Sequence, residues 1–416
     1  MNKNIILLAL CLLITVIIFT SCASHADDLM KDIEPKVESL KAEKMGEKLN
    51  MAIMNFTWNM FKESSLNEGN IMVSSPSIYY ALAMTLNGAE GDTKAAMQKS
   101  LVAQELTIDD INIGLRDWLR SMITDDSKSK LSIANSIWLR KGFEADHEFL
   151  QRNADYYNAS IKSLDFDKKS SAAIINKWVK DETEGKIDKI VDNINNNTMM
   201  YLINAIYFKS DWKEQFSANN TTSMEFNTYS GKVNAKFMNR KGEIEHLNAN
   251  KITGVKLPYE DERYAFFGLL PEEGQTPREL INKLNVSELR AVLNSGVKEA
   301  LELSMPKFEA RYEDSIKNEL SKIGMEIAFD PGYADFSLMN KDRNKNLFIS
   351  EVKHKTFIKV DEKGTEAAAV TSVEVTETAM INDIPKVVFD RPFIYGIIDT
   401  ETGIPLFMGI MENPSK

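Results

Sequence analysis

The stretch DEKGTEAAAVTSVEV, residues 361–375, decides the fold of this protein. Every second position from Thr365 onward holds a small or β-branched side chain, whereas the positions between them include Glu366 and Glu374. Because a β-strand turns successive side chains to opposite faces, this alternation is typical of a strand with one narrow buried face. The polar start and Gly364 are equally typical of an exposed loop. The pattern therefore indicates a segment that can be either a buried strand or an exposed loop.

The composition is that of an ordinary globular protein. Of 416 residues, 43% are hydrophobic and 27% are charged, and the formal net charge is −11. This length allows one large domain or two average ones. Because acidic residues outnumber basic ones and no basic run occurs, we expect no nucleic-acid partner.

The first 21 residues have the features of an export signal. Lys3 precedes an apolar run over residues 5–19, and small residues follow the run before Cys22. The run is short for a membrane-spanning helix, which needs about 20 apolar residues. We therefore predict that residues 1–21 are a signal peptide and that the mature protein is exported.

The tetrad FTSC at residues 19–22 resembles the lipobox of bacterial lipoproteins, with Phe in place of the usual Leu. This resemblance predicts a lipid on Cys22 that anchors the protein to a bacterial membrane, on the periplasmic side or at the cell surface. An ordinary signal peptide cut nearby is the alternative. The other cysteine, Cys11, lies inside the signal, so we expect neither a disulfide nor a cysteine metal site. Residues 22–45 are mostly polar and are predicted to form a tether.

From about residue 46 the hydrophobic pattern becomes regular. Apolar residues from Leu49 to Met60 recur on one helical face, and residues 199–208 form an apolar run that suits a strand buried on both faces. Helical patterns dominate the first half and strand patterns the second, which predicts an α+β fold. Because no repeat and no linker interrupts the pattern, we expect residues 46–416 to form one domain. Further helices are expected at residues 78–89 and 175–190, and further strands at 131–139, 263–270, 300–305, 357–360, 387–389, 393–399 and 405–411.

The sequence carries none of the common motifs of enzyme catalysis. It has no G-x-S-x-G elbow, no P-loop, no G-x-G-x-x-G and no H-E-x-x-H. Its four histidines lie far apart, and no spacing of histidines and carboxylates indicates a zinc site. We therefore expect a protein that is not an enzyme and that needs no cofactor and no metal.

Several segments resemble motifs of the serpins, in the order in which that family has them. HKTFIKVDEKGTEAAAVT, residues 354–371, resembles the hinge that begins the reactive-centre loop of serpins. One motif departs from the family: its usual Ser-Pro-x-Ser reads SSPS at residues 74–77, so the proline is shifted by one position. The resemblance covers about residues 46–416, and its further motifs are NKWVKDETEGKI (176–187), NAIYFKSDWKEQF (204–216), MPKF (305–308), ADFS (334–337), VVFDRPFIYGI (387–397) and PLFMGIMENP (405–414).

The resemblance implies a suicide-type inhibitor of serine endopeptidases, with cysteine endopeptidases as a further candidate class. In this family a protease attacks an exposed loop, forms an acyl-enzyme, and is trapped when the cut loop inserts into the main sheet. The implied fold is one α+β domain with a large central β-sheet, further smaller sheets, surrounding helices and a reactive-centre loop at about residues 362–385. The implied partner is a target protease, bound covalently to a monomer. A serpin without inhibitory activity, acting as a binding or carrier module, is the alternative.

The composition of the hinge favours an active inhibitor. Insertion requires one face of the loop to fit a packed sheet, where a bulky or charged side chain would cost several kcal/mol. The small-residue face meets this requirement, and Gly364 supplies a permissive backbone where the loop folds over. The hinge residues carried over from the family are Glu362, Gly364, Thr365, Ala367, Ala369 and Thr371.

The position of the attacked bond follows from the family spacing. Counted from Glu362, the bond lies between Thr378 and Ala379, whereas a count back from the C-terminal signature gives a point near Ile381. Insertion into the sheet sets the number of residues between the hinge and the attacked bond, so the count from Glu362 is preferred. A small Thr378, with Val375 before it, favours elastase-like or subtilisin-like proteases over trypsin-like ones. Rival positions are Glu377, for glutamate-specific proteases, and Met380, for chymotrypsin-like or cathepsin-type proteases.

Two structural clusters are also carried over by the resemblance. The first, here called the shutter cluster, is a hydrogen-bonded group beneath the part of the sheet that opens, and it consists of Ser74, Ser77, Asn204 and His354. The second, the breach cluster, lies at the top of the sheet where the loop enters, and it consists of Trp212, Lys307 and Glu362. We expect His354 to be a satisfied core histidine that holds and releases strand contacts, and Lys307 to pair with Glu362.

Overall fold

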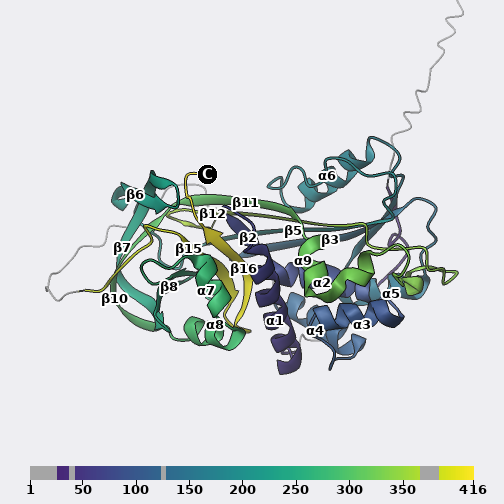
Figure 1. The fold of residues 1–416 in the computed structure, drawn as a ribbon, viewed down its shortest axis with the longest axis horizontal. Coiled ribbons are helices and arrows are strands. Elements are labelled where there is room, and N and C mark those ends of the chain that lie inside the picture. The colour runs from purple at the N-terminus through teal and green to yellow at the C-terminus, as the bar shows by residue number, and fades with distance from the viewer. Residues whose placement is uncertain (1–25, 37–42, 123–127, 366–383) are drawn as a thin grey trace, which may run out of the picture.

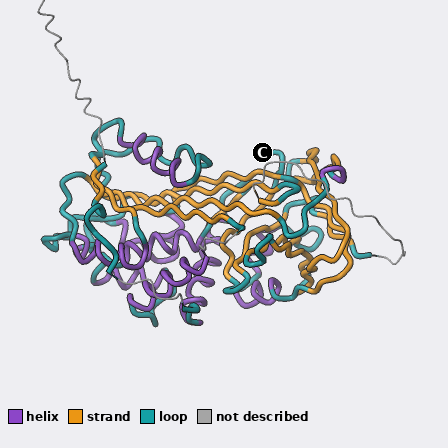
Figure 2. The backbone as a smooth tube through the Cα atoms, turned by 180° about the vertical axis from the view of Figure 1, so that it is seen from behind, coloured by secondary structure: helices purple, strands orange, loops and turns teal. Residues whose placement is uncertain are grey.

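The computed structural model describes residues 26–36, 43–122, 128–365 and 384–416. These residues form an elongated molecule in which one long β-sheet runs along the long axis (Figure 1). Most helices gather beneath one end of this sheet, and a second sheet forms the other end (Figure 2). Among the helices of these four ranges, none is both long enough and apolar enough to span a membrane.

The main sheet has seven strands in the order β1-β4-β3-β5-β13-β12-β11. β5 lies at its centre and is buried over most of its length, which confirms the strand expected from the apolar run 199–208. β5 pairs antiparallel with β3 and parallel with β12. The strands are β1 (Asp27–Asp28), β3 (Lys130–Arg140), β4 (Ser160–Leu164), β5 (Met200–Asp211), β11 (Phe308–Ser315), β12 (Glu351–Val360) and β13 (Gly364–Thr365).

The remaining strands form one nine-stranded network, β14-β10-β7-β8-β9-β15-β16-β2, with β6 paired to β7. They join into one network because β7 is 19 residues long. It pairs with β6 over residues 231–237, with β10 over residues 237–246 and with β8 over residues 245–249. The strands are β2 (Ile71–Val73), β6 (Thr222–Thr228), β7 (Gly231–Ala249), β8 (Ile252–Pro258), β9 (Tyr264–Leu270), β10 (Val297–Pro306), β14 (Lys386–Val388), β15 (Phe393–Asp399) and β16 (Ile404–Met411).

The helices cover the main sheet unequally. α6 lies on one face of the sheet, and α2 to α5 lie on the opposite face (Figure 1). α6 ends at Glu182, earlier than the predicted helix over 175–190, because Glu184 and Gly185 both adopt positive φ angles of 52° and 78°. The helices are α1 (Glu47–Ser64), α2 (Ser75–Leu86), α3 (Gly91–Ser100), α4 (Ile108–Met122), α5 (His147–Tyr157), α6 (Ser171–Glu182), α7 (Pro277–Lys283), α8 (Val286–Leu293) and α9 (Lys317–Leu320).

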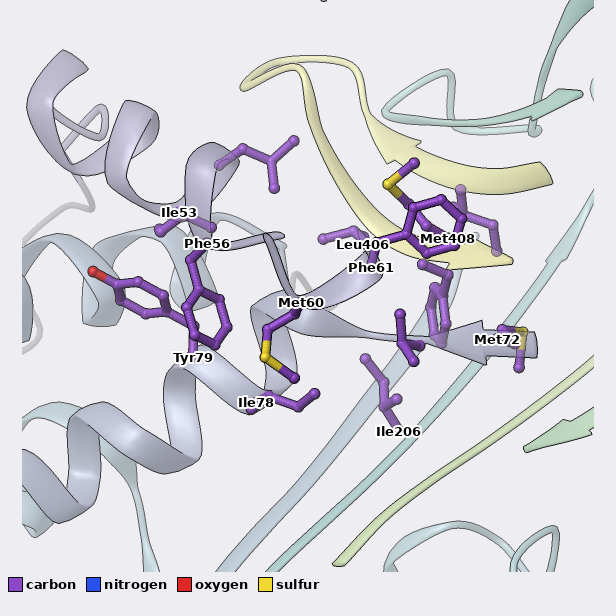
Figure 3. Close-up of a cluster of buried hydrophobic side chains, with 14 of the residues drawn as sticks. Ile53, Phe56, Met60, Phe61, Met72, Ile78, Tyr79, Ile206, Leu406 and Met408 are labelled. Carbon is purple, nitrogen blue, oxygen red and sulfur yellow. The ribbon is translucent and has the colours of Figure 1, made fainter. Parts of the chain in front are cut away.

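The main core lies between the sheets and the helices beneath them. Figure 3 shows Phe56 of α1 and Tyr79 of α2 at one side of this core, with Ile206 of β5 and Met408 of β16 at the other. The rings of Phe56 and Tyr79 meet edge to face, with their centroids 5.3 Å apart. The helical face predicted from Leu49 to Met60 is therefore buried, against α2 and against β16 and β2 of the second sheet, as its periodicity requires.

A smaller core separates α6 from the main sheet. Ile175 and Val179 of α6 pack there with Tyr201 and Tyr207 of β5 and with Phe357 of β12. This layer covers the face of the two strands that the predicted insertion would separate.

The predicted tether is partly folded onto the domain. Residues Asp27–Asp28 pair with β4 as the outermost strand of the main sheet, and the Leu29 N–H donates to the Ile161 carbonyl. Met30 and Ile33 pack against the main core. Composition alone missed this because a two-residue edge strand leaves no periodic pattern. The part of the tether that the structure describes as docked is residues 26–36.

Candidate functional site

The first residues of the predicted hinge already lie inside the main sheet. β13, Gly364–Thr365, pairs antiparallel with β5 and with the end of β12, at Val360. Farther down, β5 and β12 pair directly with each other over residues 201–207 and 351–357. β13 therefore occupies the top of a slot whose lower part is closed by the β5–β12 ladder.

Gly364 is required by the close approach of β5. A Cβ at this position would lie 2.1 Å from the Ser210 carbonyl oxygen and 2.6 Å from the Asp211 Cα. The sequence predicted a glycine needed for a permissive fold-over of the loop. The structure shows a different reason, because Gly364 is not among the glycines with positive φ and instead leaves room for backbone contact.

Thr365 points into the protein and is fully buried. Its hydroxyl lies 2.5 Å from the Tyr259 hydroxyl, and burial raises the pKa of Tyr259 well above its usual value. The Tyr259 ring stacks on Trp212 with centroids 4.7 Å apart. Thr365 of the hinge is thus hydrogen-bonded to the aromatic pair formed by Tyr259 and Trp212.

The structure brings the three breach residues together around the hinge. Lys307 Nζ lies 2.6 Å from Glu362 Oε2, and the Thr221 hydroxyl donates to Glu362 Oε1 at 2.7 Å. Burial acts to raise the pKa of Glu362, but the hydrogen bonds from Lys307 and Thr221 outweigh it and lower that pKa below its usual value. Trp212 donates its N–H to the Lys363 carbonyl at 2.7 Å and its indole Nε1–H to the Asp361 carbonyl at 2.8 Å.

Removing the lysine of this pair is expected to loosen the hinge. In Lys307→Ala, Glu362 keeps the Thr221 hydrogen bond but loses the ammonium that faces it, and its side chain remains largely buried. We expect more polymer or prematurely inserted protein, seen on a native gel after mild heating. Lys213→Ala removes a nearby but exposed ion pair with Glu262 and should leave the monomer fraction unchanged. An unchanged monomer fraction and unchanged inhibition in Lys307→Ala would count against this role.

The shutter residues also meet, beneath the closed part of the slot. His354 of β12 lies opposite Asn204 of β5 in the ladder, and its Nδ1 is hydrogen-bonded to the Asn204 side-chain oxygen. The His354 Nε2 accepts the Ser74 N–H at 3.1 Å. Asn204 in turn donates to the Ser77 hydroxyl and to Asn135 of β3. The cluster therefore ties β3, β5 and β12 to the start of α2, despite the shifted proline at residue 76.

This network assigns the proton of neutral His354 to Nδ1, because Nε2 must accept from Ser74. Burial lowers the pKa of His354 to about 3. A histidine in the unfolded chain has a pKa of about 6.5, so between these values the unfolded state binds the extra proton. His354 therefore stabilises the fold fully above about pH 6.5, and this contribution is lost as the pH falls toward 3.

The expected result is a pH-dependent free energy of unfolding that falls from pH 7 to pH 4. His354→Gln, which cannot gain a proton, should be less stable at pH 7 but should lose less stability over the same interval. Denaturant midpoints at a series of pH values measure both slopes. Equal slopes in the two proteins would contradict the assignment.

Other predicted site residues fall outside the part of the chain that the structure describes. These are Ala367, Ala369 and Thr371 of the hinge, Glu377, Thr378, Ala379 and Met380 around the predicted bond, and Cys22. Residues that sequence reasoning missed are Asn135, Thr221 and Tyr259, which contact the two clusters from distant strands and loops. None of them stands in a pattern that the sequence alone would have singled out.

The comparisons with known proteins agree on one family. The profile of the family described as "Serpin (serine protease inhibitor)" matches residues 51–414. An uncharacterised serpin-like protein of Thermococcus kodakarensis is 34% identical over 369 residues, covering 87% of this chain and 85% of that protein. These matches span nearly all of the domain, including both clusters.

Solved structures give the same result. The native state of tengpin, a thermophilic serpin, has a TM-score of 0.88 and 36% identity, covering 94% of this chain and all of that chain. Human thyroxine-binding globulin has a TM-score of 0.81 and 26% identity, covering 89% of this chain and 99% of that chain. Serpins are in general protease inhibitors rather than enzymes, although some members have no inhibitory activity. With its hinge strand, breach cluster and shutter cluster in place, the chain belongs to the serpin family.

Proposed function

We propose that this protein is a suicide-type inhibitor of serine endopeptidases that traps its target as a covalent acyl-enzyme. The single observation that carries the proposal is β13, because it shows the hinge seated in the slot that a complete insertion would fill. Thr365 faces inward, so the alternate small residues after it would face inward as well if the same strand continued.

The proposed reaction consumes one bond of the inhibitor. The serine hydroxyl of the protease attacks the carbonyl carbon of Thr378 and forms an ester, and the peptide that begins at Ala379 leaves with a new amino group. The loop ahead of the ester then extends β13 down the slot. Because insertion is faster than hydrolysis of the ester, the protease remains covalently attached.

The sheet gains hydrogen bonds when the strand extends. Insertion must break the parallel β5–β12 ladder, which runs from Glu351–Tyr201 to Phe357–Tyr207. It replaces that one ladder by two antiparallel ladders, since β13 is antiparallel to both neighbours. Parallel pairing is slightly less stable per residue, so the exchange favours the inserted form.

Mixing the protein with elastase, subtilisin, chymotrypsin and trypsin tests this function. We expect a complex that survives denaturing electrophoresis with elastase or subtilisin, and we expect the cleaved protein to unfold at a higher temperature than the intact one. Mass spectrometry of the released C-terminal peptide locates the bond among Thr378, Glu377 and Met380. Cleavage without a complex would instead support a binding or carrier module.

The location is part of the same proposal. The export signal and the lipobox-like tetrad at residues 19–22 support an exported protein with a lipid on Cys22. A protein held in this way would act on proteases at the membrane of its own cell. Labelling cells with a radioactive fatty acid, with Cys22→Ser as control, tests the anchor.

A further inference from the structure

The register of the main sheet indicates where an inserted loop would end. β13 pairs Gly364 with Asp211 and Thr365 with Ser210. Each further residue of the loop would pair with one residue earlier in β5, so Val375 would lie opposite Met200, the first residue of β5. Thr378 would then leave the sheet at this end, about 10 Å beyond Val375 at about 3.3 Å per residue.

The N-terminal segment joins the sheet in the same cross-strand row. Met200 pairs with Leu139 of β3, Leu139 with Ser163 of β4, and Ser163 with Asp27 of β1. Four strand spacings of about 4.8 Å separate the inserted strand from β1, a total of about 19 Å. Residues before Asp27 leave the sheet at the same end as Thr378 would, because β1 runs antiparallel to β4.

This end is the pole opposite Gly364–Thr365, the last described residues before the loop (Figure 1). In Figure 1, β3 and β5 run along the long axis from the end that carries β6, β7 and β10 to the end that carries α5. Residues 26–36 are held at the α5 end by Gln151, which donates to the Glu34 carbonyl at 2.8 Å, and by Asp155, which accepts the Lys36 N–H at 2.6 Å. The segment is therefore docked and cannot act as a long spacer.

The free length between this pole and Cys22 is short. Four residues lie between Cys22 and Asp27. The five residue-to-residue steps span at most about 17 Å when fully extended. A protease of about 230 residues has a radius of gyration near 17 Å and a diameter of about 45 Å. A trapped protease thus does not fit between an anchored pole and the bilayer unless the whole domain tips over.

We infer that the pole at which this protein is anchored is the pole to which a trapped protease is carried, so that a short anchor restrains completion of trapping. The inference rests on the proposed function. Its consequence concerns the two fates of the acyl-enzyme, which are hydrolysis of the ester and completed insertion. A chain held at Cys22 changes the ratio between these two outcomes relative to a free chain. More of the ester is hydrolysed before insertion is complete, and more inhibitor is consumed for each protease trapped.

A coupling experiment separates the anchor from the chemistry. The chain that starts at residue 22 has Cys22 as its only cysteine, so it can be coupled to maleimide lipid in phosphatidylcholine vesicles. Three samples are compared: the coupled chain, the coupled chain with about 40 Gly and Ser residues inserted between Ser24 and His25, and the chain with Cys22 capped beside the same vesicles. The measurement is the number of inhibitor molecules consumed per molecule of subtilisin or elastase inactivated.

We expect this number to be severalfold higher for the short coupled chain than for the capped chain, and the spacer to restore the capped value. Equal numbers in all three samples would overturn the inference. The inference would also be overturned if both coupled samples consumed equally more inhibitor per protease than the capped chain. An effect of the vesicle that does not depend on the spacer cannot come from the length of the anchor. The capped chain reports on the proposed function by itself: if it forms no covalent complex, that function fails and the inference falls with it.

Discussion

Thr365→Arg is expected to turn this protein from an inhibitor into a substrate. The Thr365 side chain is fully buried beside Tyr259, between β5 and β12, and a guanidinium there would be buried without a partner. The intact protein can avoid this penalty of several kcal/mol by moving residue 365 out of the sheet, whereas a fully inserted strand cannot. Because about 1.4 kcal/mol changes a rate ratio tenfold, we expect the yield of covalent complex to fall at least about tenfold while cleavage continues.

Thr365→Ser is the matched control, because it keeps a small side chain with a hydroxyl that can reach Tyr259. The control should form complexes as the unchanged protein does. Denaturing gels and active-site titration of the protease measure the two yields. An arginine variant with an unchanged yield would mean that residue 365 is outside the sheet when the protease is trapped.

Asn204→Ala is expected to have the second large effect, on the stability of the native state. The substitution removes the acceptor of the His354 Nδ1–H and the donor to Ser77 and Asn135. A buried donor left without a partner costs about 1–3 kcal/mol, and the other lost bonds add to that cost. Because the lost contacts join β5 to β3, β12 and α2, the slot should open more easily, and gentle heating should give polymeric or inserted forms.

Asn234→Ala provides the comparison, since Asn234 is an exposed asparagine in a strand. Thermal midpoints and native gels of the two variants should differ clearly, with only Asn204→Ala losing monomer. The shutter cluster would have no holding role if both variants kept the midpoint and the monomer fraction of the unchanged protein.

The sequence predicted the breach and shutter residues because each stands in a motif that resembles a known family. It did not reveal their partners. Tyr259 reaches Thr365 from the end of β8, and Thr221 reaches Glu362 from the link between β5 and β6. Such contacts depend on how distant strands pair, and no local periodicity records that pairing. Several helices were also missed, because only part of the surface of each is apolar and buried: α3, α4, α5, α7 and α8.

By itself, the sequence determined the α+β class, the central buried strand, the alternation of the hinge and the residue types that an insertion requires. Those properties are local, since they follow from side-chain size and from the two-residue period of a strand. Only the tertiary structure decided that Gly364 and Thr365 already lie between β5 and β12, and that Asp27–Asp28 form the outermost strand at the far edge of the same sheet. Both facts arise from pairing between segments far apart in the chain, where the hydrogen bonds of a neighbouring strand, rather than local propensity, set the conformation.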